Sequence, residues 1–575
     1  MTKKESRIVL LSITLCWASA YIFIKDVPQE FSVYAYLTLT SGVAGIILAL
    51  LFFRQMFQIS RKALIYSFIL ALLIAGNMVF EKLALDSLPA SSVSTIASLN
   101  IVVVPLIMAL RRQFPSRNNV AGIVIILAGI FLSTSFSLQG NGLMGFVYVV
   151  ISCVLMSLYI VLAQDYTREA SPLLLTVLQL CFTALIGLML CVVTDPGSVT
   201  KIEWSAETLS YILIIAFFSK AYAYAMLMYG EKYADAISVT VIASTEPIVT
   251  ILLALIIPNA MGNTELFSVR SLLSACIIAV GAIVAGTDFL SGDKKESVQE
   301  DRVSSENYVA EERSMPETEP SGEVSDENRK LSRLLTCLIL IGLFAVLSIS
   351  INVFEFAEGY SEIRPENLFP IVGGLLLGPL GALSCAIGNF LGDLLWIQEY
   401  GLTTIPGFAA NFFAAFIPYM VWRSFSDESP NAHSWKNLGL FAFGSFLGNL
   451  ASAWILNVGT QLFAGTWYES LMQASFVNNT IFSIAFGLPL FIVLTSEKIW
   501  NYEGILPKKS RTVSKMAMLH LTALLLIQFV CNERGINLAT GPFMSVFSLV
   551  TAICLLVFFI MPFTAKDAGP ESNIN

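Results

Sequence analysis

The chain has 575 residues, of which 56% are hydrophobic and only 13% are charged, and its mean hydropathy is +0.74. Soluble domains carry roughly 25% charged residues, so this composition indicates an integral membrane protein. Apolar runs of about 20 residues, the length that crosses a bilayer, recur along the chain without polar alternation. The pattern excludes an outer-membrane barrel and predicts an all-α polytopic membrane protein.

Little in the sequence points to catalysis. The chain has two histidines, His433 and His520, and no HExxH, CxxC, GxxxxGK[ST] or GxSxG string. Because these strings mark metalloenzymes, ATPases and serine hydrolases, we predict no enzyme, no metal site and no cofactor. The nine cysteines lie in or beside apolar runs without paired spacing and are interpreted as packing residues.

The acidic residues are concentrated in one segment. The formal net charge is -8, and residues 293–330 alone hold twelve Asp/Glu against six Lys/Arg. This segment has few aliphatic residues, so it buries too little surface to offset its ordering entropy. We predict a disordered acidic linker over 291–330 between a membrane domain of 1–290 and another from 331. A phosphorylatable regulatory tail is the alternative.

The loop charges predict the topology. Eighteen apolar spans are expected to begin near residues 8, 33, 64, 91, 119, 143, 172, 208, 234, 268, 333, 368, 380, 405, 436, 470, 513 and 543. Lys and Arg recur in alternate loops and beside the first span, and cytoplasmic loops carry this excess. The sequence therefore predicts a multi-pass protein of the cell membrane with both termini and the linker in the cytoplasm.

The first ten spans contain an internal duplication. A shift of 146 residues places the stretch 90–100 on 236–246, with identities at Ala90/Ala236, Ser92/Ser238, Val93/Val239, Ala97/Ala243 and Ser98/Ser244. The two copies cover 1–137 and 143–287. Because each copy has five spans, the second enters the membrane from the opposite side, which makes the copies inverted repeats. Carriers built this way bind substrate between the repeats near the midplane.

Polar residues inside these spans are candidates for a substrate site, because such residues are costly in a membrane. Lys220 and Glu246 are expected at similar depth, where they either pair or face a shared cavity. A structural salt bridge between adjacent helices is the alternative. An amphipathic lining is predicted from Trp17, Tyr21, Asn100, Gln179 and Tyr224. For each of these five, simple packing is the competing interpretation.

Three stretches of the N-terminal half carry a family resemblance. They are Cys16–Lys25, Ala90–Pro105 and Ala236–Pro247 with its Thr-Glu-Pro. Together with the glycine-ended fifth and tenth spans, they resemble the drug/metabolite transporter superfamily, EamA type, over about 1–287. The resemblance implies a ten-helix carrier of amino acids or other small metabolites, often an exporter. The first copy departs from the Glu-Pro pattern, because Ile101 stands where the second copy has Pro247.

In the C-terminal half, polar residues gather toward one side of the predicted spans. These residues are Asp393, Asn411, Asn449, Asn478 and Asn479. A charged loop at 355–367, which contains Arg364, precedes them. The predicted topology puts both sets on the outer side and so predicts an outward-opening polar pocket. The alternative is that the asparagines join helices by interhelical hydrogen bonds.

A second resemblance lies in the same half. Gly374xxxGly378, Gly388xxxGly392 and Gly444xxxGly448 are interpreted as helix-packing motifs. The stretch 360–382, continuing through 387–393, resembles the membrane S components of energy-coupling factor (ECF) vitamin transporters over about 331–497. The resemblance implies a six-helix domain at 331–500 that captures a vitamin or nucleobase-like molecule from outside, with the loop holding Arg364 as a lid.

The ECF family also implies coupling subunits as partners. The small-residue Ala-x-x-x-Ala surface that would dock them is not evident in 334–351. The two additional transmembrane helices at 501–565 match neither family.

Three functions compete at this point. The leading hypothesis is a transporter of small metabolites, in which a ten-helix secondary carrier is fused to a substrate-binding membrane domain. Its expected partners are a small-molecule substrate and the lipid bilayer, with no nucleic acid. The alternatives are a membrane sensor whose S-component-like domain regulates its neighbour and, with less support, a lipid flippase.

Overall fold

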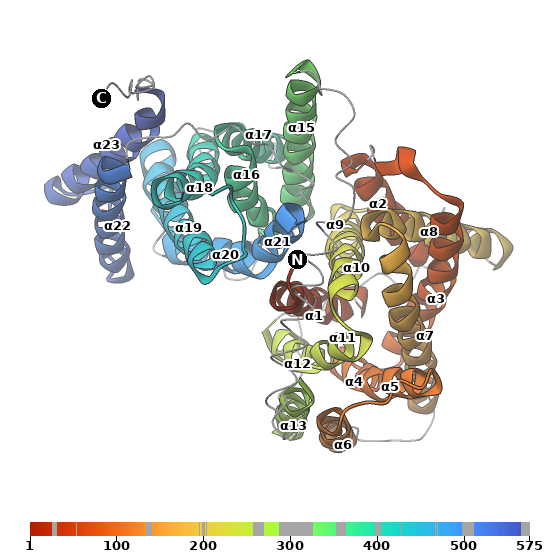
Figure 1. Ribbon diagram of the computed structural model, residues 1–575. Coiled ribbons are helices and arrows are strands. Elements are labelled where there is room, and N and C mark those ends of the chain that lie inside the picture. The colour runs from red at the N-terminus through yellow and green to blue at the C-terminus, as the bar shows by residue number, and fades with distance from the viewer. Residues whose placement is uncertain are drawn as a thin grey trace, which may run out of the picture. The chain divides into compact units, whose positions relative to one another are not determined.

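The computed structural model describes residues 1–25, 32–52, 55–133, 141–194, 196–197, 202, 204–256, 269–286, 326–351, 364–396, 404–426, 428–465, 467–468, 470–496 and 511–564. Within these ranges the secondary structure is helical, without strands. The chain divides into two compact units, an N-terminal unit of residues 6–204 and 215–332 and a C-terminal unit of residues 1–5, 205–214 and 333–575 (Figure 1).

The first sequence copy forms six helical pieces. They are α1 (Lys3–Lys25), α2 (Val33–Leu51), α3 (Arg61–Leu85), α4 (Ala90–Ala97), α5 (Asn100–Leu110) and α6 (Arg117–Ser133). Ser32 and Ser60 cap α2 and α3, since each hydroxyl accepts a hydrogen bond from a backbone N–H of the first turn. The span predicted from residue 91 is broken after Ala97 by a turn at Ser98 and is therefore two half-helices.

The second copy repeats this plan. Its elements are α7 (Asn141–Glu169), α8 (Pro172–Thr194), α9 (Ala206–Ile214), the π-helical segment η2 (Ile215–Tyr222), α10 (Ala223–Tyr233), α11 (Ala236–Ala243), α12 (Glu246–Ile256) and α13 (Val269–Gly286). The span predicted from residue 234 breaks after Ala243, 146 residues beyond the first break. Pro247 follows at the second position of α12, where its missing N–H leaves no helical bond unmade.

The two copies pack on each other symmetrically. The equivalent helices α2 and α8 are in contact, as are α6 and α13, while the halves of the broken spans pack reciprocally, α4 on α12 and α5 on α11. This reciprocity is what a two-fold relation between the copies produces. The duplication read from the sequence is therefore also a structural one.

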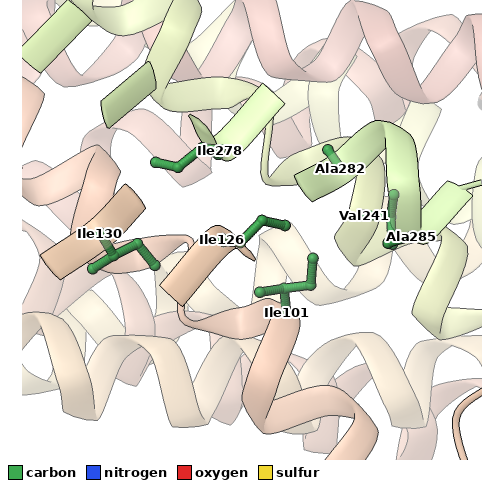
Figure 2. Close-up of a cluster of buried hydrophobic side chains, with 7 residues drawn as sticks. All are labelled: Ile101, Ile126, Ile130, Val241, Ile278, Ala282 and Ala285. Carbon is green, nitrogen blue, oxygen red and sulfur yellow. The ribbon is translucent and has the colours of Figure 1, made fainter. Parts of the chain in front are cut away.

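An aliphatic cluster forms where these pairs meet. It contains Ile101, Ile126 and Ile130 from the first copy and Val241, Ile278, Ala282 and Ala285 from the second, and Figure 2 shows the two sets between ribbons of the two copies. Serine and glycine bring α6 and α13 close, because the Ser274 hydroxyl donates to the Gly129 carbonyl at 2.7 Å. The core of the N-terminal unit thus joins the repeats.

The C-terminal unit is a bundle with two interrupted spans. Its elements are α15 (Asp326–Ile351), η3 (Pro365–Leu368), α16 (Phe369–Leu377), α17 (Pro379–Trp396), α18 (Thr404–Phe425), α19 (Trp435–Ala464), α20 (Leu471–Phe482), the π-helical segment η4 (Ser483–Gly487), α21 (Leu488–Ser496), α22 (Arg511–Glu533) and α23 (Pro542–Thr564). Gly378 separates α16 from α17 with a φ of 61°, a left-handed conformation that favours glycine.

Glycines of this unit bring helix backbones together, as their spacing predicts. A Cβ on Gly374 would lie 1.8 Å from the Ala415 carbonyl oxygen of α18. Gly388 and Gly392 of α17 contact Phe344 and Ser348 of α15 in the same way. In a bilayer, close backbone approach of this kind is a principal source of helix association.

A buried polar network holds the last two helices to the bundle. The Gln528 amide oxygen of α22 accepts hydrogen bonds from Trp454 Nε1 of α19 at 2.7 Å and from the Ser548 hydroxyl of α23 at 2.8 Å. Asn532 of α22 donates to the Gln473 amide oxygen of α20 at 3.2 Å. These helices, which resemble neither family in sequence, are therefore integral to the C-terminal unit.

Thirteen helices of the described ranges are long and apolar enough to cross a membrane, against eighteen predicted spans. Four further apolar stretches are shorter: α6, α13, η3 with α16, and α17. The nine residues of α16 rise only about 14 Å, roughly half the thickness of a hydrocarbon core. The all-α polytopic class is confirmed, whereas the spans predicted from 368 and 380 are short helices on either side of Gly378.

Candidate functional site

The matching breaks bring two predicted residues to the same place. Asn100 begins α5 and Glu246 begins α12, each directly after a break. Ser98 and Ser244 occupy the turns, and all four residues line one cavity of the N-terminal unit. Discontinuous helices of this kind free backbone groups inside the membrane and form the substrate sites of many inverted-repeat transporters.

The cavity has a volume of about 50 Å³, room for the centres of a few water molecules. It is lined by Trp17, Ala20 and Tyr21 of α1, Asn77 and Glu81 of α3, Ala97, Ser98 and Asn100 at the first break, Ser152, Cys153, Met156 and Ile160 of α7, Ser219, Lys220 and Tyr224 of η2 and α10, and Thr240, Ala243, Ser244 and Glu246 at the second break. Both copies therefore contribute to it.

The amine of Lys220 and the carboxyl groups of Glu81 and Glu246 face this cavity. Lys220 is 3% exposed and Glu246 is 7% exposed. Lys220 interacts electrostatically with Glu81, and its Nζ also lies 5.9 Å from the ring centroid of Tyr36, a cation–π distance. Glu246 lies within hydrogen-bonding reach of the Tyr21 hydroxyl, while its Oε1 has no partner. The cavity thus offers one cation, two acidic groups and a free acceptor.

Helix α7 holds the two cavity asparagines in place. Asn77 Nδ2 donates to the Ser152 hydroxyl at 2.7 Å. The Asn100 amide oxygen accepts from Cys153 Sγ at 2.8 Å and from the Ser157 hydroxyl at 3.1 Å. With their orientations set in this way, the remaining amide groups are directed by the protein rather than by a ligand.

Aromatic side chains form one wall. The rings of Trp17 and Tyr224 meet edge to face with centroids 5.9 Å apart, and Tyr224 meets Tyr159 at the same separation. Gln179, a predicted lining residue, does not reach the cavity. It is fully buried and donates to the Tyr159 hydroxyl at 3.2 Å, so it holds Tyr159 in the aromatic wall without lining the cavity itself.

The structure therefore brings together six of the seven residues predicted for this site: Trp17, Tyr21, Asn100, Lys220, Tyr224 and Glu246. Sequence reasoning missed Glu81 and Asn77. In the structure α3 continues to Leu85, and Lys82 pairs with Asp86 at 2.6 Å. Glu81, the residue before Lys82, lines the cavity instead.

In the C-terminal unit, predicted residues meet around the start of η3. The backbone N–H of Arg364 donates to the Asn478 amide oxygen at 3.2 Å, and Asn478 Nδ2 donates to the Arg364 carbonyl at 3.3 Å and to Asn479 Oδ1 at 3.3 Å. Asn449 Nδ2 donates to Ser483 at 3.2 Å, and Ser483 donates to the Asn367 carbonyl at 3.2 Å. Arg364, Asn449, Asn478 and Asn479 thus share one stretch of the bundle.

The other two predicted residues lie where α17 packs on α18. Asp393 accepts a hydrogen bond from Asn389 at 3.0 Å. Asn411 donates to the Gly407 carbonyl one turn before it at 3.1 Å, and Gly407 itself faces Asn389 and Asp393. The Asn411 amide oxygen is buried without a partner. This second group is linked through Gly407 rather than through Arg364.

Some sequence predictions fall outside the described ranges. These are the acidic linker up to residue 325 and most of the charged loop, residues 355–363. Of that loop, Arg364, Glu366 and Asn367 are described, and Glu366 and Asn367 are buried.

Comparison with known proteins supports both resemblances. Residues 6–135 and 143–287 match the model of the EamA-like transporter family, and residues 329–497 match the model of the ECF-type riboflavin transporter S component. A search of curated proteins finds no match. A solved structure titled only "Crystal structure of protein" aligns with 49% of this chain and 96% of its own at 16% identity, with a TM-score of 0.40.

Both family models describe membrane transporters of small molecules, which points away from an enzyme. The two matched regions agree with the two halves recognised from sequence motifs. The chain therefore joins an N-terminal half that resembles the EamA-like transporter family to a C-terminal half that resembles the S components of ECF-type riboflavin transporters.

Proposed function

We propose that this protein is a secondary carrier of small metabolites, in which the N-terminal half moves an amino-acid-like solute and the C-terminal half binds a vitamin- or nucleobase-like one. The observation that carries the first part is the cavity between the copies. Lys220 opposite Glu81 and Glu246 suits a solute with both a carboxylate and an ammonium group. The unpartnered Oε1 of Glu246 is an acceptor for the ammonium.

The cavity is too small to hold the proposed solute in the described conformation. About 50 Å³ admits a few waters, less than an amino-acid-like solute occupies. Under the proposal, the cavity enlarges when one side opens and the broken helices move apart. Binding energy from the charged groups then favours the state that holds the solute, as alternating access requires.

The second part of the proposal rests on the C-terminal family model, whose name specifies riboflavin. Polar groups around Arg364, Asn449 and Asn478 would fix such a ligand within a mostly apolar bundle. Riboflavin is therefore the first ligand to test for this half. Coupling subunits of the ECF type are an expectation of the same resemblance.

The test is reconstitution of the full chain into proteoliposomes without other proteins. Uptake and counterflow of labelled amino acids, vitamins and nucleobases are measured for the natural sequence, for Glu246→Gln and for Glu169→Gln, whose carboxylate is exposed and pairs with Lys62 at 3.0 Å. We expect transport that Glu246→Gln abolishes and Glu169→Gln retains. Absence of flux for every solute, or equal flux in both variants, contradicts the carrier assignment. Binding without flux favours the sensor alternative.

A further inference from the structure

Glu231 is a second buried carboxylic acid of the N-terminal unit, and it does not line the cavity. It lies near the end of α10 and is 1% exposed. Neither of its carboxylate oxygens has a hydrogen-bond partner. An ionised carboxylate buried in a protein needs an ion-pair or hydrogen-bond partner, because desolvation otherwise makes its charge very costly.

Among the described side chains, Glu231 forms no ion pair. The elements packed on α10 include α7, α8, α11 and η2, and α1 also meets α10 at Gly230. Of the α1 residues beside this contact, Glu5 pairs with His433 and Arg7 is exposed. The titratable groups on these elements have other partners. Asp165 of α7 pairs with Arg111, and Lys220 of η2 interacts with Glu81. Tyr222 of η2 donates to Ser12, and α11 has no titratable side chain. On α10 itself, Lys232 lies over the Tyr233 ring at 5.2 Å.

One titratable group does interact with Glu231, namely Tyr159 of α7. Tyr159 is a neutral hydrogen-bonding group that is held by Gln179 and lies edge to face against Tyr224. Tyr224 lines the cavity. Tyr159 and Tyr224 therefore lie between Glu231 and the cavity.

Helix α1 contacts α10 at Gly230, the residue before Glu231. The Ser6 hydroxyl of α1 donates to the Gly230 carbonyl at 3.0 Å. A Cβ on Gly230 would lie 2.4 Å from a methyl carbon of Leu10, so the two helices touch at this point. If α1 moves away from α10, water reaches the Glu231 carboxyl and hydrates its ionised form. Separation of these helices would thus favour proton release, and their closure would favour proton uptake.

We propose that Glu231 is a proton-binding site outside the substrate cavity, and that loading it with a proton is linked to the closing of α1 on α10. The proton comes from water on the open side, bonds to a carboxylate oxygen of Glu231, and returns to water when the helices part. If the N-terminal half is the carrier proposed above, proton binding at Glu231 makes its transport responsive to a pH gradient.

A spectroscopic experiment tests the site without any substrate. The infrared difference spectrum between the natural full chain and Glu231→Gln at neutral pH isolates the C=O stretch of one protonated carboxylic acid. We expect that band in the natural protein, its loss in Glu231→Gln, and an unchanged band in Glu169→Gln. A carboxylate band in its place shows that Glu231 is ionised and overturns the proposal, whatever the protein transports.

Transport measurements test the coupling. In proteoliposomes, a gradient of one pH unit drives about tenfold accumulation when one proton moves per solute. We expect Glu231→Gln to lose this accumulation but to keep counterflow, which shows that it is folded, and Glu231→Asp to recover part of it. If flux through the natural protein does not depend on the pH gradient, the coupling is refuted and the carrier function is unaffected. Absence of any flux refutes the carrier function, and the infrared band still decides whether Glu231 holds a proton.

Discussion

Gly122 and Gly281 face each other across the two copies, each against the backbone of the other. A Cβ on Gly122 would lie 2.5 Å from the Gly281 carbonyl oxygen, and a Cβ on Gly281 would lie 2.9 Å from the Gly122 carbonyl oxygen. The contact is reciprocal because α6 and α13 are equivalent helices of a duplicated chain. It places the tightest backbone approach of this pair beside the aliphatic cluster of Figure 2.

Substitution of Gly122 by alanine is expected to destabilise the N-terminal unit. The added methyl would overlap Gly281 and Ala285, and such overpacking costs typically ~1–3 kcal/mol. Gly342→Ala is the matched control, because a Cβ there meets nothing within 4 Å. Thermal unfolding of the detergent-solubilised chain checks the difference, and equal transition temperatures would refute the packing argument.

Neutralising one member of the Lys220–Glu81 pair should harm folding more than neutralising both. Lys220→Met removes the cation that interacts electrostatically with the Glu81 carboxylate, which then lines the cavity without a compensating charge. The double variant with Glu81→Gln removes that uncompensated charge. Folded yield in a double-mutant cycle measures the coupling. Transport should fail in all three variants, whereas strict additivity in yield would show that the two charges act independently.

Removal of the Asn478 side chain is expected to weaken riboflavin binding by the C-terminal unit. Asn478 bonds both the N–H and the carbonyl of Arg364, so Asn478→Ala loosens the start of η3 and should cost ~1–3 kcal/mol of binding. Calorimetry on the full chain compares it with Arg364→Ala and with Lys436→Ala, an exposed control. Unchanged affinity in the first two variants would exclude this region as the ligand site.

Gln528→Leu should detach α22 and α23 from the bundle without affecting the N-terminal unit. The leucine leaves Trp454 Nε1 without its acceptor, and an unsatisfied buried donor costs about 1–3 kcal/mol, whereas the Ser548 hydroxyl keeps the Leu538 carbonyl as an acceptor. Hydrogen exchange of the two helices is expected to rise. His520→Leu, at an exposed position on α22, is the control. Equal protection in both variants would contradict a structural role for the network.

The topology prediction can be checked by cysteine labelling in intact cells. Ser304→Cys in the linker and Ser572→Cys near the C-terminus should resist an impermeant thiol reagent, because positive loops favour a cytoplasmic location for both segments. Permeabilised cells supply the positive control. Labelling of either cysteine from outside would invert the predicted orientation.

Much of the fold could be predicted from the sequence, because apolar span length and a duplicated polar string are local properties of the chain. The equivalence of Asn100 and Glu246 was visible from the shift of 146 residues, and their common cavity followed from the inverted-repeat plan. The two family resemblances rested on the same kind of local motif.

Only the tertiary structure decided which groups meet. Glu81 was not singled out in the sequence, yet in the structure it lines the cavity and interacts electrostatically with Lys220. Gln179 looked like a lining residue until Tyr159 was found between it and the cavity. Sequence spacing reports the depth of a side chain along one helix. The direction in which that side chain points depends on how the helix is rotated against its neighbours, and that rotation is set by close packing between residues distant in sequence.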